Sequence, residues 1–585
     1  MKNFLRLAYP VLLTVMACWL VFSYQGRPKH GVDDAQILFS YSSNLAAGHG
    51  LVYANNPEHV EGTTSLLWTL ICAIPFRLGL DERGVLAIAV LILCLTQILA
   101  LDIVRRSAAA RQIPTWPFAL LYLFLVFSCP AYFTWMSITL MDTCLWGFLI
   151  VLMVYVALEP PRSRLGVAIA SIPFFLAPLS RPEAVLVAPA VIVLAWLHDG
   201  AGHEDRRRLV LSLTAAVFVS VVAVTVFRLG YFGYPLPNTY YAKVSPSLFY
   251  NLQQGKDYFY RYASTSGPII GVSVLFVLGL AAWSAGALAA ALSSCLRTRR
   301  WPYARITDWK LVALAAAILL FVPVLTGGDH FQMFRFYQPV YPIVALTPVL
   351  FLIAWSPARA SAQLASLLRP DRHLVPFCFL SVLLAYWACD LSQAPSWSSI
   401  RDRNNRSPIW YEFSIAETGI RTGKKLSGLF AGARALPTIG VITAGGIART
   451  YPGRIVDLMG LNTSAIAHDR GDRKGVKDHA AFEKDAFFKL GRIDVLLAFP
   501  PVPPDTTSYD SRVLKGLLDD PRFVEKWRYG LLYPSGSEND SVVAFYSAGF
   551  VDSLETTARY RFRETMRWSH RWVPVDSSGG AEIHN

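Results

Sequence analysis

Over its first 391 residues the chain alternates between long apolar runs and short polar stretches. An apolar run of about 17 residues or more is long enough to cross a bilayer as a helix. The pattern therefore predicts a polytopic α-helical membrane protein with about eleven transmembrane helices. The runs are 8–24, 85–104, 115–130, 141–158, 165–180, 184–198, 209–229, 267–294, 310–326, 337–355 and 373–391.

A further apolar run, 64–79, could either cross the membrane or lie along its outer surface. The choice decides on which side of the membrane the short arginine-rich loops fall. If the N-terminus is inside and 64–79 does not cross, every such loop is cytoplasmic, where Lys and Arg are enriched. We therefore predict a juxtamembrane helix at 64–79. The loops carry Arg105, Arg106 and Arg111; Arg162 and Arg164; Arg206, Arg207 and Arg208; Arg297, Arg299, Arg300 and Arg305; and Arg359, Arg369 and Arg372.

The composition changes after residue 391, where charged residues become frequent and the apolar runs shorten. We predict a transmembrane domain at 1–391, with a first outer loop at 25–84, followed by an α/β domain at 392–585. The topology places this second domain outside the membrane. Four short apolar segments in it are typical of buried strands: Thr438–Ile442, Ile455–Leu458, Asp494–Phe499 and Ser541–Tyr546.

The composition of the whole chain agrees with a membrane protein. Hydrophobic residues make up 54% and charged residues only 16%, against about 25% charged in soluble proteins. The net charge of +14 comes from basic clusters between apolar runs, so it predicts membrane topology and no nucleic-acid binding. The 8 cysteines lie in or beside apolar runs without CxxC spacing, so the sequence encodes neither a zinc site nor a redox motif.

With this topology, the polar residues at the ends of apolar runs gather on the outer face. Ionisable groups at such positions are costly unless they are paired or face a wet cavity. We therefore predict one polar pocket formed by five outer loops. Its candidate residues are Asp33, Asp34, His49, His59, Glu61, Asp142, Arg181, Glu183, Asn238, Tyr240, Lys243, Asp329, His330 and Arg335.

The chemistry that this residue set suits is glycosyl transfer from a lipid-linked donor. A hydroxyl acceptor needs a carboxylate as general base, and Asp33 and Asp34 are the candidates, although either could cap the helix predicted at 35–47. A leaving phosphate needs cations as its charge develops. No nucleotide-binding loop is present, as expected for a reaction outside the membrane. The candidate cations are Arg181, Lys243, His330 and Arg335.

Several of these residues have a second interpretation. Glu61, Asp142 and Glu183 are equally suited to pairing with basic residues, which would make them structural. A divalent cation could bind His49 and His59 together with the aspartates, but surface histidines usually bind none, so the sequence leaves a metal open. A transporter or flippase of a lipid-linked saccharide is the alternative function. It would need ionisable groups nearer the middle of the spans.

Six segments resemble, in the same order, those of a GT-C glycosyltransferase family whose best-known members are the mycobacterial terminal arabinofuranosyltransferases. Where that family often carries Gly-Leu/Met-Glu-Thr, this chain has Leu140-Met141-Asp142-Thr143, so the acid is retained but is shorter. The segments are Asp33-Asp34-Ala35, Asn44–Val52, Val60–Ser65, Pro237–Lys243, Gly327–His330 with Arg335, and Gly440–His468.

The resemblance implies a polyprenyl-phosphate donor, such as decaprenyl-phosphate arabinofuranose, and an inverting mechanism whose base is in the Asp33–Asp34 pair. It implies a site on the outer face of a bacterial cytoplasmic membrane, with a cell-envelope glycan or an exported protein as acceptor. The identity of the sugar does not follow from these motifs. The residues expected to contact donor phosphate or sugar are Arg181, Asn238, Tyr240, Lys243, Asp329, His330 and Arg335.

Overall fold

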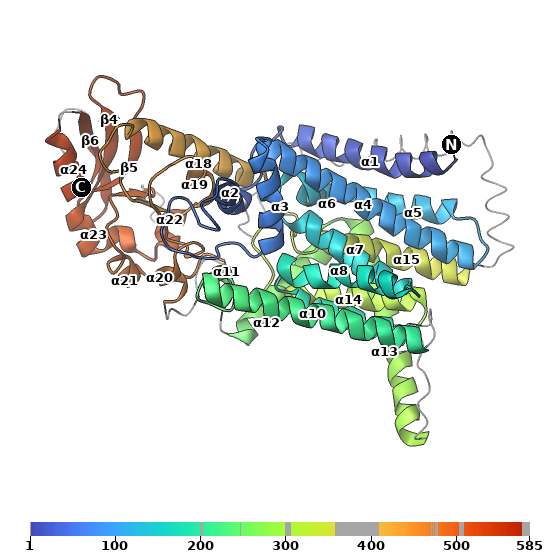
Figure 1. Cartoon of the computed structure of the whole chain (residues 1–585). Coiled ribbons are helices and arrows are strands. Elements are labelled where there is room, and N and C mark those ends of the chain that lie inside the picture. Colours follow the sequence, from blue (N-terminus) through green and yellow to red (C-terminus); the bar gives the residue numbers. More distant parts are fainter. Residues whose placement is uncertain are drawn as a thin grey trace.

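The computed structural model consists of a bundle of apolar helices and a domain built on one β-sheet, lying end to end (Figure 1). The predicted span at 373–391 lies outside the residues that the structure describes. These residues are 2–198, 203–245, 247–298, 306–356, 409–469, 471, 473, 478–501, 508–557 and 559–575.

The predicted apolar runs from 8–24 to 337–355 are helical, which confirms a polytopic helical bundle. The elements that form it are α1 (Lys2–Tyr24), α4 (Asp81–Ala110), α5 (Trp116–Phe127), α6 (Pro130–Phe133), η1 (Thr134–Ile138), α7 (Thr143–Leu158), α8 (Arg164–Ser180), α9 (Ala184–Leu197), α10 (His203–Tyr231), α12 (Leu248–Thr265), α13 (Pro268–Thr298), α14 (Asp308–Leu325), η2 (Gln338–Val340) and α15 (Tyr341–Trp355).

The number of full-length spans among the described residues is lower than the predicted eleven. Five helices are long and apolar enough to cross a membrane, or six if α5 and the segment Pro130–Ile138, which meet at 73°, form one broken span. Four more of the predicted runs are apolar helices of 10–17 residues: Ala8–Tyr24, α7, α8 and α9. The sequence therefore located these helices correctly, and the structure does not confirm the predicted number of spans.

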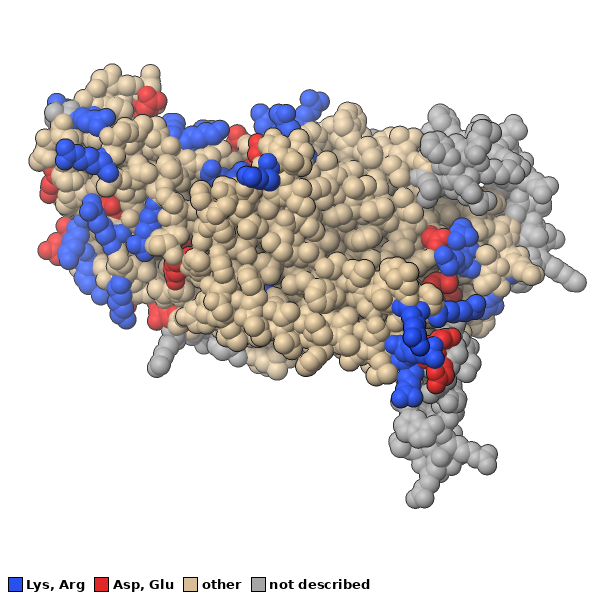
Figure 2. Space-filling view, in the orientation of Figure 1, with Lys and Arg blue, Asp and Glu red and all other residues tan. Residues whose placement is uncertain are grey.

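The arginine-rich loops that the structure describes, at 105–111, 162–164 and 206–208, lie at the end of the bundle remote from the sheet domain. Arg106 pairs with Glu159 at 3.3 Å, while Asp308 bonds Ser107 at 3.0 Å and His198 at 2.9 Å, so four interhelical segments meet there. Figure 2 shows Lys and Arg gathered at this end and again on the sheet domain, with uncharged residues between them. This distribution agrees with a bilayer around the middle of the bundle.

Two further helices, α2 (Asp33–Ala46) and α3 (Leu66–Arg77), lie where the bundle meets the sheet domain (Figure 1). With 12 residues, α3 is about 18 Å long, whereas the hydrocarbon core is about 30 Å thick. It exposes Leu70 and Ile74 on one face. A short helix with an exposed apolar face agrees with the surface position predicted for 64–79.

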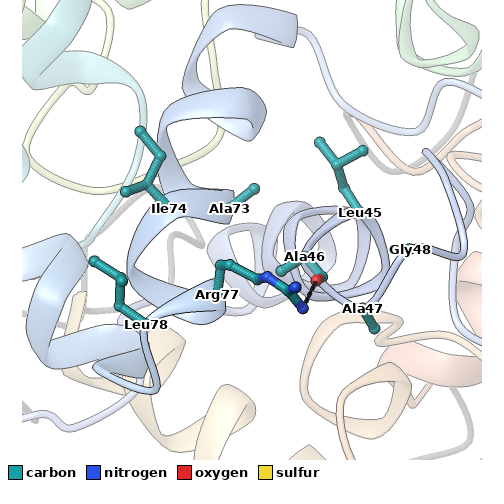
Figure 3. A pocket seen from close by; sticks show the side chains of 8 residues that line it. All are labelled: Leu45, Ala46, Ala47, Gly48, Ala73, Ile74, Arg77 and Leu78. Atoms are coloured by element: carbon teal, nitrogen blue, oxygen red, sulfur yellow. Dashed lines mark hydrogen bonds between the residues drawn. The ribbon is translucent and has the colours of Figure 1, made fainter.

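A groove of about 580 Å³ separates the C-terminal end of α2 from α3 (Figure 3). Its walls are mostly apolar, and Arg77 donates a hydrogen bond across it to the carbonyl oxygen of Ala46 at 3.3 Å. The groove lies at the opposite end of α2 from Asp33 and Asp34. It is therefore separate from the predicted polar pocket.

The sheet domain contains seven strands in the order β2-β1-β3-β5-β4-β6-β7. Strands β2, β1 and β3 are parallel, and the remaining pairs are antiparallel. The helices around the sheet are α18 (Ile409–Leu429), α19 (Gly445–Ala448), α20 (Ser464–Ala467), α21 (Lys484–Phe487), α22 (Tyr509–Val513), η3 (Leu517–Asp519), α23 (Pro521–Lys526) and α24 (Ala548–Glu555).

The four predicted strands are confirmed as β1 (Ile439–Val441), β2 (Ile455–Asp457), β3 (Val495–Leu497) and β5 (Val542–Ser547). Three strands were not predicted: β4 (Trp527–Pro534), β6 (Tyr560–Trp568) and β7 (Trp572–Pro574). Each of them mixes buried positions with partly or fully exposed ones, and β6 carries four charged side chains. They lack the continuous apolar run that marks a strand buried on both faces.

Buried hydrogen bonds fix the first loop of the bundle to the sheet domain. The hydroxyl of Tyr41 bonds Asn462 at 2.9 Å, and the side chain of Asn56 both donates to and accepts from the backbone of Ile455. From α11 (Asn238–Lys243), the amide of Asn238 donates to the carbonyl oxygens of Gly460 and Leu461 at 2.7 and 3.0 Å. These contacts set the position of the sheet domain over the end of the bundle.

Candidate active site

The centre of the site is the carboxylate of Asp34, in the first turn of α2. Arg335 donates from Nη1 to its Oδ2 at 3.2 Å, and Nζ of Lys243 lies 3.6 Å from the same oxygen. The Asp34 side chain remains 23% exposed, so a ligand can reach it. One carboxylate and two cations from three distant parts of the chain therefore converge at a partly exposed site.

The charges around Asp34 determine its ionisation. Burial opposes the charged form, but Lys243 and Arg335 outweigh it and lower the pKa of Asp34 below its usual value. Asp34 is consequently ionised at neutral pH. An acid with a lowered pKa is a weak base. In this arrangement Lys243 and Arg335 therefore reduce the basicity of the Asp34 carboxylate.

A second layer of charges lies behind Arg335. Its Nε is 2.6 Å from Oδ2 of Asp329, and Nδ1 of His330 is 3.4 Å from Oδ1 of Asp329 and 2.9 Å from Oδ2 of Asp478. Burial alone would lower the pKa of His330, but the two carboxylates raise it to about 9. His330 is therefore an imidazolium at neutral pH and extends the positive side of the pocket.

The Gly-Gly turn before Asp329 has a steric reason. Both glycines have positive φ, 91° at Gly327 and 69° at Gly328, and a Cβ on Gly328 would come within 2.5 Å of the Tyr258 ring. Only glycine fits this turn without strain. The turn brings Asp329 and His330 against the end of the bundle.

Three donor atoms, from Asp329, His330 and Asp478, lie within 4.8 Å of one another, a spacing that a divalent cation could use. Arg335 and the His330 imidazolium already balance the two carboxylates. The sequence suggested His49 and His59, together with the aspartates, as ligands of a divalent cation. The structure does not bring these two histidines to the aspartates. His49 is exposed beyond the end of α2, and the ring of His59 packs on Tyr231 at 4.5 Å.

Arg181 belongs to a separate buried cluster. It pairs with Asp142 at 3.1 Å and with Glu183 at 2.8 Å, so two carboxylates already surround its charge. The ring of Phe336 lies between this cluster and Arg335, 5.2 Å from the Arg181 guanidinium and 5.0 Å from that of Arg335. Arg181 thus has a structural role beside the site. To contact the donor phosphate as predicted, it would have to break its ion pair with Asp142 or Glu183.

A small cavity of about 30 Å³ lies between the two arginines, with apolar walls from α9 and α14. The turn before α7 positions Asp142 beside Arg181. In this turn Leu140 has a φ of 60° and its carbonyl accepts from Nε1 of Trp68 at 3.1 Å. A non-glycine residue with this backbone is held in place by its surroundings. The Leu140–Asp142 segment therefore packs tightly behind the pocket.

Asp33 does not cap α2, because the N-cap is Val32 and no side-chain cap bond is formed. Its carboxylate instead accepts hydrogen bonds from the backbone N–H groups of Gly445 and Gly446, both at 2.9 Å. Burial raises the pKa of Asp33 to about 6, and these two bonds oppose the rise. A Cβ on Gly445 would come within 2.0 Å of the Asp33 carbonyl oxygen. Asp33 thus joins the two domains.

Three other predicted residues lie away from Asp34 or are already bonded. Glu61 forms a buried two-bond ion pair with Arg228, at 2.7 and 3.0 Å. The Asn238 amide is bonded to the sheet domain, as described above. Tyr240 is 46% exposed and packs edge-on against Tyr241. Of the predicted residues, the structure brings together Asp34, Lys243, Asp329, His330 and Arg335.

Two acids near this group were missed by the sequence analysis. Asp478 lies in a charged stretch of the second domain, where nothing in the pattern marks it. Glu412 is on α18 and shares its buried face with Ile409, Phe413 and Ala416. An acid on the apolar face of a helix is unusual, and that signal could have identified Glu412 from the sequence.

No protein-family model matches the chain, and no curated protein matches it. Among solved structures, the chain is similar to ArnT from Cupriavidus metallidurans bound to undecaprenyl phosphate, with a TM-score of 0.47, 13% identity and coverage of 92% of this chain and 98% of that one. It is also similar to the archaeal oligosaccharyltransferase AglB from Archaeoglobus fulgidus in complex with an inhibitory peptide and a dolichol-phosphate. There the TM-score is 0.43, with 11% identity and coverage of 92% and 74%.

Proposed function

We propose that this protein is a membrane glycosyltransferase that moves a sugar from a polyprenyl-phosphate donor to a hydroxyl group, with Asp34 as general base. The observation that carries the proposal is the contact of Asp34, whose side chain is 23% exposed, with both Lys243 and Arg335 at the end of a membrane bundle. A carboxylate beside paired cations provides both a base for the acceptor and a binding site for a phosphate.

The two cations have alternative partners in this proposal. In the structure Lys243 and Arg335 pair with Asp34 and lower its pKa. A donor phosphate beside them would neutralise part of their charge, so the pKa of Asp34 would rise towards neutrality. Asp34 would then be a stronger base only when the donor is bound, which limits reaction of the empty site.

The transfer step is a single displacement at the anomeric carbon. Asp34 removes the proton of the acceptor hydroxyl while the acceptor oxygen bonds to that carbon from the face opposite the phosphate. The bond from the anomeric carbon to the phosphate oxygen breaks, and polyprenyl phosphate leaves with the electron pair. Arg335, Lys243 and the His330 imidazolium stabilise the negative charge that develops on the phosphate. The configuration at the anomeric carbon is inverted.

The proposed sugar is arabinofuranose, because the motif resemblance is to arabinofuranosyltransferases. The proposed acceptor is a hydroxyl of a cell-envelope glycan or an exported protein. The described arginine-rich loops, at 105–111, 162–164 and 206–208, lie at the far end of the bundle, which supports a site on the outer face of the bacterial cytoplasmic membrane. ArnT and AglB are described with undecaprenyl phosphate and dolichol-phosphate, and the proposed donor is of that class.

The test uses the full chain in liposomes with synthetic polyprenyl-phosphate donors that carry arabinofuranose, mannose or aminoarabinose. We expect one donor, the arabinofuranose one, to be consumed with release of free polyprenyl phosphate, and its sugar to appear on an added glycan. If instead a donor crosses the bilayer unchanged, the protein is a transporter or flippase. If every donor stays intact and in its own leaflet, the proposed function is wrong.

A further inference from the structure

Glu412 is a buried acid that the proposed reaction leaves without a role. It lies in the first turn of α18, which packs against α2 and α19. Its side chain is on the buried face of the helix, and the residue is 8% exposed, while the flanking Ile409 and Ala416 are fully buried. Residues three and four apart share a helix face, so the acid takes a position that would ordinarily be apolar.

The Glu412 carboxyl has no hydrogen bond or ion pair within the described part of the chain. A buried polar group without a partner destabilises a fold. Glu412 nevertheless lies within electrostatic range of four charged groups of the site: His330, Asp34, Asp33 and Asp329. Tyr509, at the start of α22, is a further neighbour. The helix α18 packs against α2, whose first turn carries Asp34, and against α19, whose backbone holds Asp33. Glu412, in the first turn of α18, therefore lies on the sheet-domain side of the site.

The ionisation of Glu412 follows from this position. Burial, together with the three aspartates, raises its pKa to about 7, although the positive charge of His330 opposes the rise. At neutral pH such a carboxyl can accept a hydrogen bond and, in its protonated form, donate one. Both forms suit a neutral hydroxyl, whereas a phosphate beside the ionised form would be repelled.

We propose that Glu412 is the acceptor-binding residue of this glycosyltransferase and that it hydrogen-bonds a hydroxyl of a neutral, hydroxyl-rich acceptor beside Asp34. The inference rests on the proposed function. The donor arrives from the bilayer with a negative phosphate, and its cations are Arg335, at the end of the bundle, and Lys243, on α11. The acceptor arrives from the aqueous side, where α18 provides Glu412. The two substrates thus meet from opposite domains, with Asp34 between them.

The unpaired carboxyl gives this role a signature that a structural role lacks. A structural acid is bonded in the empty protein, so its removal leaves a buried partner unpaired and lowers stability. Among the residues that the structure describes, removing Glu412 leaves no such partner. Glu412→Gln keeps the shape of the side chain while it loses the charge and one acceptor position. We expect the midpoint of thermal unfolding in this variant to be equal to or above that of the unaltered protein.

The decisive experiment compares Glu412→Gln with Glu417→Gln. Glu417 is on the same helix but its side chain is 60% exposed and its contact is His30, at 3.7 Å. The full chain in liposomes is assayed with decaprenyl-phosphate arabinofuranose as donor and octyl arabinofuranoside as acceptor, and both concentrations are varied. Slow hydrolysis of the donor by water, which needs no bound acceptor, is recorded in parallel.

For Glu412→Gln we expect the acceptor KM to rise about tenfold, the effect of losing one hydrogen bond to a charged group. The donor KM and the rate of donor hydrolysis should stay within about twofold of the unaltered protein, as should every constant of Glu417→Gln. An unchanged acceptor KM would overturn the inference, and so would an equal rise in both KM values. If the unaltered protein consumes no donor at all, the proposed function fails and the inference falls with it.

Discussion

Replacing Arg335 by glutamine tests whether this side chain is both a structural and a catalytic cation. Its guanidinium contacts Asp34 and Asp329 and lies over the Phe331 ring at 4.4 Å. Asp329 is only 2% exposed, so Arg335→Gln leaves a buried carboxylate without its main partner. Breaking a buried ion pair from one side costs about 3–5 kcal/mol, and we expect a loss of unfolding free energy of this size.

The assay is a double-mutant cycle with Arg335→Gln, Asp329→Asn and the double variant, measured by chemical unfolding in detergent. The double variant removes both charges. Its loss of unfolding free energy should therefore be about 1–3 kcal/mol smaller than the sum of the losses in the two single variants. Sugar transfer should stay about 10²–10³-fold low in the double variant, because the cation for the phosphate is still missing. Additive losses of stability, or transfer that recovers together with stability, would refute this reasoning.

Two further changes test neighbouring contacts. Asp33→Asn weakens the two bonds from Gly445 and Gly446, so we expect protease to cut between bundle and sheet domain several times faster, while Asp552→Asn on the exposed side of α24 has no effect. His330 has a folded pKa of about 9, above its usual value of 6.5, so its stabilising charge is fully present below pH 6.5 and is lost as the pH rises through 9. Unfolding midpoints measured from pH 6 to 10 should fall across this range in the unaltered protein and fall less in His330→Gln. Parallel curves would exclude His330 as the titrating group.

The sequence was sufficient for features that depend on continuous apolar patterns. Each helix of the bundle and each of the strands β1, β2, β3 and β5 is marked by a run of mostly apolar residues. The strand β6 is mixed in polarity because one of its faces is exposed, so no pattern distinguished it. The length of a helix was also hidden, because an apolar run continues through the turns and kinks that divide α5 from η1.

The pairing of the site residues could not be predicted, because packing decides it. Asp34 and Arg335 are 301 residues apart in sequence, and nothing local indicates that they meet. Asp33 and Asp34 are adjacent and chemically identical, yet the first turn of α2 directs Asp33 to the backbone of α19 and Asp34 to the cations. The sequence could identify the pair as important, but only the fold separates the docking residue from the candidate base.

The most direct measurement of the central claim is the rate of sugar transfer by Asp34→Asn, with Asp257→Asn as the matched control on an exposed position of α12. If Asp34 is the general base, transfer should fall about 10²–10⁴-fold in Asp34→Asn while binding of the polyprenyl-phosphate donor persists, and Asp257→Asn should transfer at the unaltered rate. Transfer by Asp34→Asn within a few fold of the unaltered protein would contradict the account.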